Sequence, residues 1–89
     1  MIENRVEYIA DKLKESFNTR SVEVIDESHL HAGHAGARDG KGHFKVIIRS
    51  NVFLDKSLIE RHRMIYAVLQ EALETDIHAL SIEAKTEQE

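Results

Sequence analysis

The fold is decided by residues 43–84, HFKVIIRSNVFLDKSLIERHRMIYAVLQEALETDIHALSIEA. Apolar and polar residues alternate over 43–50 and again over 77–84, and this period of two predicts β-strands. Between them, apolar residues recur at helical spacing from residue 58 to about residue 74. A strand, a helix and a strand in this order form a right-handed unit whose two strands lie parallel.

Each of these two strands is predicted to place its apolar side chains on one face. The core face then holds Phe44, Val46 and Ile48 from the first strand and Leu80, Ile82 and Ala84 from the second. Lys45 and Arg49 fall on the other face, so we expect that face of the sheet to be largely exposed to water.

The helix between the strands has a recognisable start. Ser57 and Glu60 form an S-x-x-E capping box, in which each side chain accepts a hydrogen bond from the backbone of the other residue. The helix is predicted to run to about Glu74. Its expected buried stripe is Leu58, His62, Ile65, Leu69 and Leu73, and the connection before it is expected to pack Val52, Phe53 and Leu54.

The N-terminal part of the chain adds a helix and a further strand. Apolar residues recur at helical spacing from residue 2 to residue 17, and residues 21–26 alternate as a strand that can pair antiparallel with the next one. We therefore predict one α/β (α+β) domain over residues 1–85, in the order αββαβ with a three-stranded mixed sheet. A short polar tail, 86–89, is expected to fray.

The connection between the first two strands is unusual. Residues 28–43, SHLHAGHAGARDGKGH, hold four of the six histidines and all four glycines of the chain. Long loops in small domains are usually functional, and neutral imidazole is the commonest metal ligand in proteins. This loop delivers the chain to the start of the strand at 43–50, and His78 lies at the start of the parallel strand. We therefore expect the loop histidines and His78 to meet at one edge of the sheet.

The composition excludes several classes of protein. No apolar run approaches the ~20 residues of a membrane span, and the N-terminus lacks a secretory signal, so we expect a cytoplasmic protein without membrane contact. The 89 residues include no cysteine. The chain therefore has no disulfide, no thiol nucleophile and no thiolate metal site of its own. Nothing matches H-E-x-x-H or a nucleophile elbow, so we expect a binding module and not an enzyme.

Basic residues gather in the middle of the chain. Residues 38–63 hold seven basic and three acidic residues, and the remainder holds five basic and thirteen acidic residues. A basic face attracts phosphate, so DNA binding is an alternative function, although the net charge of −4 disfavours it. Its expected contacts are Lys45, Arg49, Lys56, Arg61 and Arg63, with the Arg61-His62-Arg63 helix at the centre.

Several short motifs in this chain resemble the BolA family. They are VEVIDES at 22–28, the loop histidines, HFKV at 43–46, SNVF at 50–53, RHRMIY at 61–66 and IHALSI at 77–82. Each motif is weak alone, but their order and spacing are specific from the first helix to Ala84. The resemblance implies a fold similar to the type II KH domain, with the helices on one face of the sheet.

The resemblance also implies a partner and a cofactor. BolA-like proteins pair with monothiol glutaredoxins of the Cys-Gly-Phe-Ser (CGFS) type and share a bridging 2Fe-2S cluster with them, in cluster trafficking or iron sensing. The glutaredoxin cysteine and a glutathione thiol hold one iron. The BolA-like chain brings a third-strand histidine, which corresponds to His78, and a loop ligand, which corresponds to His31 or His34. No cluster is expected on the isolated chain.

The remaining polar residues of these motifs are given supporting roles. His43 opens the second strand, so it either donates a hydrogen bond beside the metal ligands or only ends the loop. His62 is expected in the core. Arg61 and Arg63 are expected to contact an acidic partner surface, and the resemblance to family members that regulate transcription favours the same helix for DNA.

Overall fold

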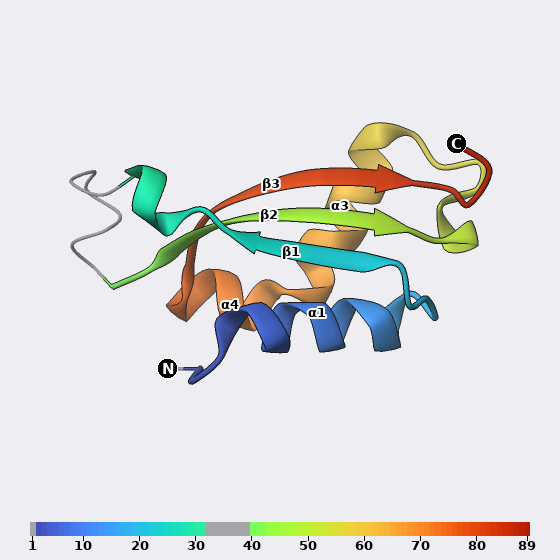
Figure 1. The fold of residues 1–89 in the computed structure, drawn as a ribbon. Helices are drawn as coiled ribbons and strands as arrows, with labels where there is room; N and C mark the ends of the chain where they lie inside the picture. The colour runs from blue at the N-terminus through green and yellow to red at the C-terminus, as the bar shows by residue number, and fades with distance from the viewer. Residues whose placement is uncertain (1, 32–39) are drawn as a thin grey trace.

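The structure is a computed structural model that describes residues 2–31 and 40–89 (Figure 1). Its elements follow the predicted order, with two short 3₁₀ helices added. They are α1 (Arg5–Ser16), β1 (Val22–Asp26), η1 (Ser28–His31), β2 (Gly42–Arg49), η2 (Asn51–Phe53), α3 (Leu58–Val68), α4 (Gln70–Thr75) and β3 (Ile77–Lys85). Among the described residues, no helix has the length and apolar character that a membrane crossing requires.

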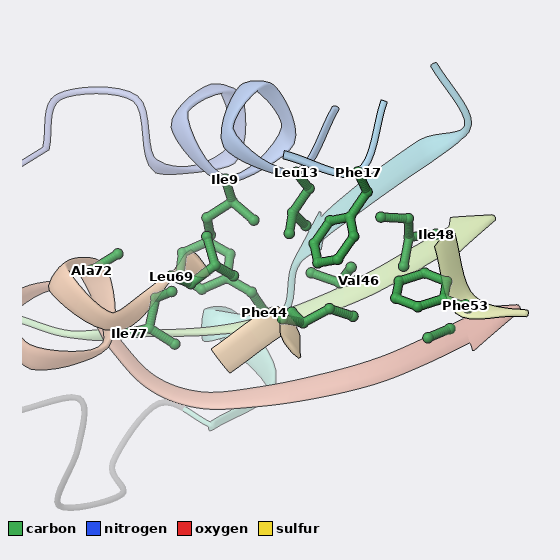
Figure 2. Close-up of a cluster of buried hydrophobic side chains, with 12 residues drawn as sticks. Ile9, Leu13, Phe17, Phe44, Val46, Ile48, Phe53, Leu69, Ala72 and Ile77 are labelled. Carbon is green, nitrogen blue, oxygen red and sulfur yellow. The ribbon is translucent and has the colours of Figure 1, made fainter. Parts of the chain in front are cut away.

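The three strands form one mixed sheet in the order β1-β2-β3. Strand β2 pairs antiparallel with β1 and parallel with β3, as the sequence predicts. Because β2 and β3 are parallel, both start at the same end of the sheet, on the left of Figure 1. The helices cover one face of the sheet, and their apolar side chains close the core against it (Figure 2).

The core is built from the alternating residues of β2 and the inner faces of the helices. Phe44, Val46 and Ile48 are each at most 1% exposed, which confirms the predicted core face of this strand. The α1 helix adds Ile9 and Leu13, and its cap residue Phe17 stacks near Phe53 with ring centroids 5.0 Å apart. The buried cluster is Ile9, Leu13, Phe17, Phe44, Val46, Ile48, Phe53, Ile65, Leu69, Ala72, Ile77 and Ala84.

The predicted stripe of the second long helix is wrong at its first turn. The helix is broken at Leu69 into α3 and α4, and Leu58 is 65% exposed. His62 is half-buried, whereas its neighbour Arg61 is buried. Ile65 and Leu69 are buried as predicted, and the observed stripe continues through Arg61 and Ala72 in place of Leu58 and His62.

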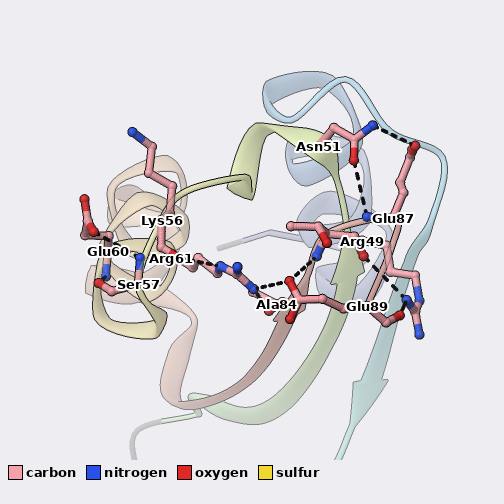
Figure 3. A network of polar contacts seen from close by, with 10 residues as sticks. Arg49, Asn51, Lys56, Ser57, Glu60, Arg61, Ala84, Glu87 and Glu89 are labelled. Carbon is pink, nitrogen blue, oxygen red and sulfur yellow. Dashed lines mark hydrogen bonds and ion pairs between the residues drawn. The ribbon is translucent and has the colours of Figure 1, made fainter.

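Two further expectations at the far end of the sheet need correction. In the connection at 51–56, only Phe53 is buried, while Val52 and Leu54 are 44% and 43% exposed. The tail 86–89 packs instead of fraying, since Thr86 is 4% exposed and Glu89 pairs with Arg61 (Figure 3). Short-range patterns missed both because the contacts that decide them come from distant parts of the chain.

Candidate functional site at the start of strands β2 and β3

The starts of β2 and β3, where the site is expected, lie at one edge of the sheet. Gly42, the first residue of β2, pairs with Ile77, the first residue of β3. The short helix η1, whose last residue is His31, lies at the same end of the molecule (Figure 1). His34 lies outside the described residues, and only the backbone of His31 is placed. The expected meeting of His31 and His34 with His78 therefore stays a prediction.

His78 is placed by an irregularity in the sheet. Gly42 pairs with Ile77, but the next residue, His43, pairs with Ala79, so His78 is an extra residue on β3. Such a bulge changes which side of the strand the following side chains take, and bulges often redirect a side chain at a functional site. His78 is exposed, although strict alternation would have put it on the buried side with Leu80.

His43 lies beside His78 on the neighbouring strand. The two imidazole ring centroids are 5.1 Å apart and the rings are tilted by 56°. His43 is 7% exposed, and its backbone is fixed at both polar groups: its N–H donates to Ser28 Oγ at 3.1 Å and its carbonyl accepts from the Glu27 N–H at 2.8 Å. His43 is therefore in ring contact with His78, and its role beside metal ligands stays a prediction.

Position 42, directly before His43, has room for a glycine and is too crowded for a larger side chain. A Cβ atom on Gly42 would lie 2.7 Å from Ser28 Oγ and 2.7 Å from Cε2 of Phe44. Both neighbours belong to the packed structure, so neither can move away without loss. Asp26 fixes Ser28 in turn, because its Oδ1 accepts the Ser28 N–H at 2.9 Å. Hydrogen bonding from Ser28 lowers the pKa of the Asp26 carboxyl below its usual 3.8, despite partial burial.

A shallow depression opens next to the two histidines. Its volume is about 310 Å³, and its lining comes from the turn after β1 and from the first residues of β2 and β3. The lining residues are Glu27, His43, Phe44, Ala79, Leu80 and Ser81. His43 lines the depression, whereas the exposed His78 lies outside its lining.

The donors at this edge are nitrogen atoms. The chain has no cysteine, and no three His, Asp or Glu side chains within residues 2–31 and 40–89 are grouped closely enough to hold a metal ion. His78 gives this edge one exposed imidazole, and imidazoles can replace thiolates on one iron of a 2Fe-2S cluster.

Arg61 does not have the surface role that the sequence suggested. It is 8% exposed, and its Nη1 donates to the Ala84 carbonyl at 3.0 Å and to Glu89 Oε1 at 2.9 Å (Figure 3). Its Nε donates to the Lys56 carbonyl at 3.0 Å. These contacts hold the guanidinium inside the fold, so Arg61 is a structural residue, and it is unavailable to an acidic partner or to DNA.

The other basic residues remain near the surface. Lys56 and Arg63 are exposed, and Lys45 and Arg49 are half-buried on the sheet face without helices. Arg49 also donates to the backbone carbonyls of Thr86 and Glu89, so part of its guanidinium is engaged. The basic surface is therefore smaller than the composition of residues 38–63 suggests.

Comparison with known proteins identifies the family. The family model described as BolA-like protein matches residues 13–89. The DNA-binding transcriptional regulator BolA of Escherichia coli is 41% identical over 86 residues, which cover 97% of this chain and 76% of that protein. SufE-like protein 1 of Arabidopsis thaliana, named chloroplastic/mitochondrial, is 47% identical over 83 residues, which cover 88% of this chain.

A solved structure agrees with these matches. BolA1 from Arabidopsis thaliana superposes with a TM-score of 0.82 at 40% identity, covering 99% of this chain and 97% of that one. The chain spans only 22% of the length of SufE-like protein 1 and 57% of that of the chloroplastic protein BOLA1 of the same plant. Because the family model covers most of the chain and the bacterial relative is similar over 97% of it, the chain belongs to the BolA family.

Proposed function

We propose that this BolA-family protein is an adaptor that binds a CGFS-type monothiol glutaredoxin and shares a bridging 2Fe-2S cluster with it. It would act as a heterodimer in iron–sulfur cluster trafficking or iron sensing, as a binding module without catalytic turnover. The observation that carries the proposal is the exposed imidazole of His78, which a bulge turns out of the sheet beside His43.

The donor chemistry supports a shared site. A chain without cysteine supplies no thiolate to a cluster, so any thiolate ligands come from a partner, and in the proposed complex they are the glutaredoxin cysteine and glutathione. His78 would be one ligand of the BolA-side iron, and His31 or His34 would be the second. When bound, the cluster is cargo or signal. The chain's own residues contribute binding and orientation.

The experiment mixes this chain with a glutathione-loaded monothiol glutaredoxin under reducing conditions and follows visible absorption and circular dichroism. His78→Ala should abolish the spectrum of the bridged complex while leaving the far-ultraviolet dichroism of the free chain unchanged. His31→Ala and His34→Ala then identify the second ligand. His29→Ala is the matched control, because His29 is exposed and belongs to the same short helix as His31. An unaltered cluster spectrum in the His78 variant would refute the proposal.

DNA binding is the second candidate, and the name of the Escherichia coli relative favours it. Here it would use Lys45, Arg49, Lys56 and Arg63, without the buried Arg61. Binding that weakens steeply with salt, and that weakens further in a Lys56→Ala/Arg63→Ala double variant, would support it. We also propose that this chain acts in the cytoplasm, although the names of two plant relatives place those proteins in the chloroplast or mitochondrion.

A further inference from the structure

We propose that Arg5 and Asp76 are positioning residues, which together fix the backbone at Gly40–Gly42 against the start of β3 and thereby set where His78 stands. The part of this inference that concerns the cluster rests on the proposed function. The part that concerns the edge of the sheet stands on its own and is tested in the free protein.

Asp76 is the centre of this arrangement. It lies between α4 and β3, two residues before His78, and it is 1% exposed. Its Oδ2 accepts from Arg5 Nε at 2.9 Å and from the Ile2 N–H at 3.1 Å, and its Oδ1 accepts from Thr75 Oγ1 at 2.6 Å. These donors offset the free-energy cost of burying the carboxylate, and because they approach both of its oxygens they hold it in one orientation.

The backbone of Asp76 connects the starts of two strands. Its carbonyl accepts from the N–H of Gly42, the first residue of β2, at 2.8 Å. Its own N–H donates to the Ala72 carbonyl at 2.7 Å, which ends α4. One residue therefore joins the end of α4, the start of β3 and the start of β2, directly before the bulge that exposes His78.

Arg5 extends this connection to the N-terminal helix. Its Nε holds the Asp76 carboxylate, while its Nη2 donates to the carbonyl of Gly40. Gly40 adopts a left-handed backbone with φ 76°, which a side chain would strain. The planar fork of arginine spans both acceptors at fixed geometry, and the single ammonium of a lysine has no such fork. The pair thus determines the distance between the last residues of the loop and β3.

The charge state of Asp76 agrees with this geometry. Burial acts to raise the pKa of the Asp76 carboxyl, but hydrogen bonds from Thr75, Arg5 and the Ile2 backbone hold that pKa below its usual 3.8. Groups that hydrogen-bond directly to metal ligands typically change metal affinity by about 10- to 100-fold when they are altered, and we expect Arg5 and Asp76 to act in the same direction through the backbone.

The test compares Arg5→Gln, Arg5→Lys and Asp76→Asn with a matched control, Arg61→Gln. Arg61 is the arginine of the Arg61–Glu89 ion pair, and its contact with Ala84 places it at the opposite end of β3. In the free protein, hydrogen exchange of the Gly42 N–H is measured by NMR. Each exchange rate is compared with the global stability of the same variant. On this scale, we expect the Gly42 N–H to exchange faster than in the wild type in both Arg5 variants and in Asp76→Asn. In Arg61→Gln it should exchange as in the wild type.

The second measurement is the affinity of each variant for the glutathione-loaded glutaredoxin, followed by the visible dichroism of the bridged complex. We expect the Arg5 variants to lose about tenfold or more in affinity with an altered dichroic spectrum, and Arg61→Gln to keep both. The double variant Arg5→Gln/Asp76→Asn should lose less affinity than the sum of the two single losses, because both changes break the same Arg5–Asp76 contact.

Wild-type exchange at Gly42 in Arg5→Gln, or full rescue by Arg5→Lys, would overturn the positioning role, since the pair would then be only a charge contact. A wild-type chain that forms no bridged complex would refute the proposed function instead. In that case the exchange measurement still decides whether the pair positions this edge.

Discussion

At the scale of single residues, the site depends on how tightly the start of β2 is surrounded. Gly42 has Ser28 on one side and the Phe44 ring on the other, and its N–H is held by the Asp76 carbonyl. His43 follows directly, with its backbone bound to both Ser28 and Glu27. The position of the buried imidazole is therefore imposed by its neighbours along and across the sheet.

Gly42→Ala should destabilise the fold and disturb this edge. The new Cβ would lie 2.7 Å from both Ser28 Oγ and Phe44 Cε2, so side chains or backbone must shift, at an expected cost of about 1–3 kcal/mol in the free energy of unfolding. Urea denaturation measures it, with Ser81→Ala at an exposed position of β3 as the control. Equal midpoints for the Gly42 variant and the wild type would show that this crowding relaxes freely.

His78 illustrates how far residue-level reasoning from sequence reaches. Its place at the start of a parallel strand follows from the strand–helix–strand pattern alone. Its exposure does not, because the bulge arises from a register shift between Gly42 and His43, and register is a property of two strands. Arg61 was misplaced for a related reason: a charged residue is expected outside, and its acceptors on Ala84 and Glu89 lie 23 and 28 positions along the chain.

At the scale of elements, local signals worked where the structure is local. The capping box at the start of α3 is formed as predicted: Ser57 Oγ accepts the Glu60 N–H at 3.1 Å, and Glu60 Oε1 accepts the Ser57 N–H at 3.0 Å. The break at Leu69 was missed, because nothing in the residues around it is a helix breaker. After the break, Ala72 packs in the core and Asp76 pairs with Arg5.

The capping box gives α3 a defined pH dependence. Hydrogen bonds from Ser57 lower the pKa of the Glu60 carboxyl below its usual 4.5. A group whose pKa is lower in the folded state stabilises the fold above its unfolded pKa, so this contribution is complete above pH 4.5 and is lost as the pH falls through the lower, folded value.

The measurement is urea denaturation of wild type and Glu60→Gln from pH 7 to pH 3. The stability difference between them should shrink as the pH falls through this range, because protonation makes the wild-type side chain neutral as well. Ser57→Ala should lose about 1 kcal/mol at neutral pH through the missing cap. A Glu60→Gln difference that stays constant down to pH 3 would contradict the assigned cause.

At the scale of the whole molecule, the sheet separates two ends with different tasks. The starts of β2 and β3 carry the exposed imidazole, the depression and the Arg5–Asp76 pair. The opposite end is closed by segment 86–89, whose Glu89 meets Arg61 and whose backbone carbonyls meet Arg49 (Figure 3). Order and topology were predictable from the sequence because hydrophobic periodicity determines them. The closure was not, because it depends on polar contacts between distant segments.

This closure predicts that the tail contributes to stability. Ending the chain after Lys85 would remove the buried Thr86 and the carboxylate that pairs with Arg61, leaving a buried guanidinium with fewer acceptors. An unmet donor of this kind typically costs about 1–3 kcal/mol, so the shortened chain should unfold at clearly lower urea concentration than the full chain. Glu87→Gln is the control, because Glu87 is exposed and its contact with Asn51 lies at the surface.

Since this end is remote from His78, the shortened chain should also keep its affinity for the glutaredoxin under conditions in which it remains folded. A loss of that affinity without a loss of stability would mean that the partner reaches across the sheet to the far end of the molecule.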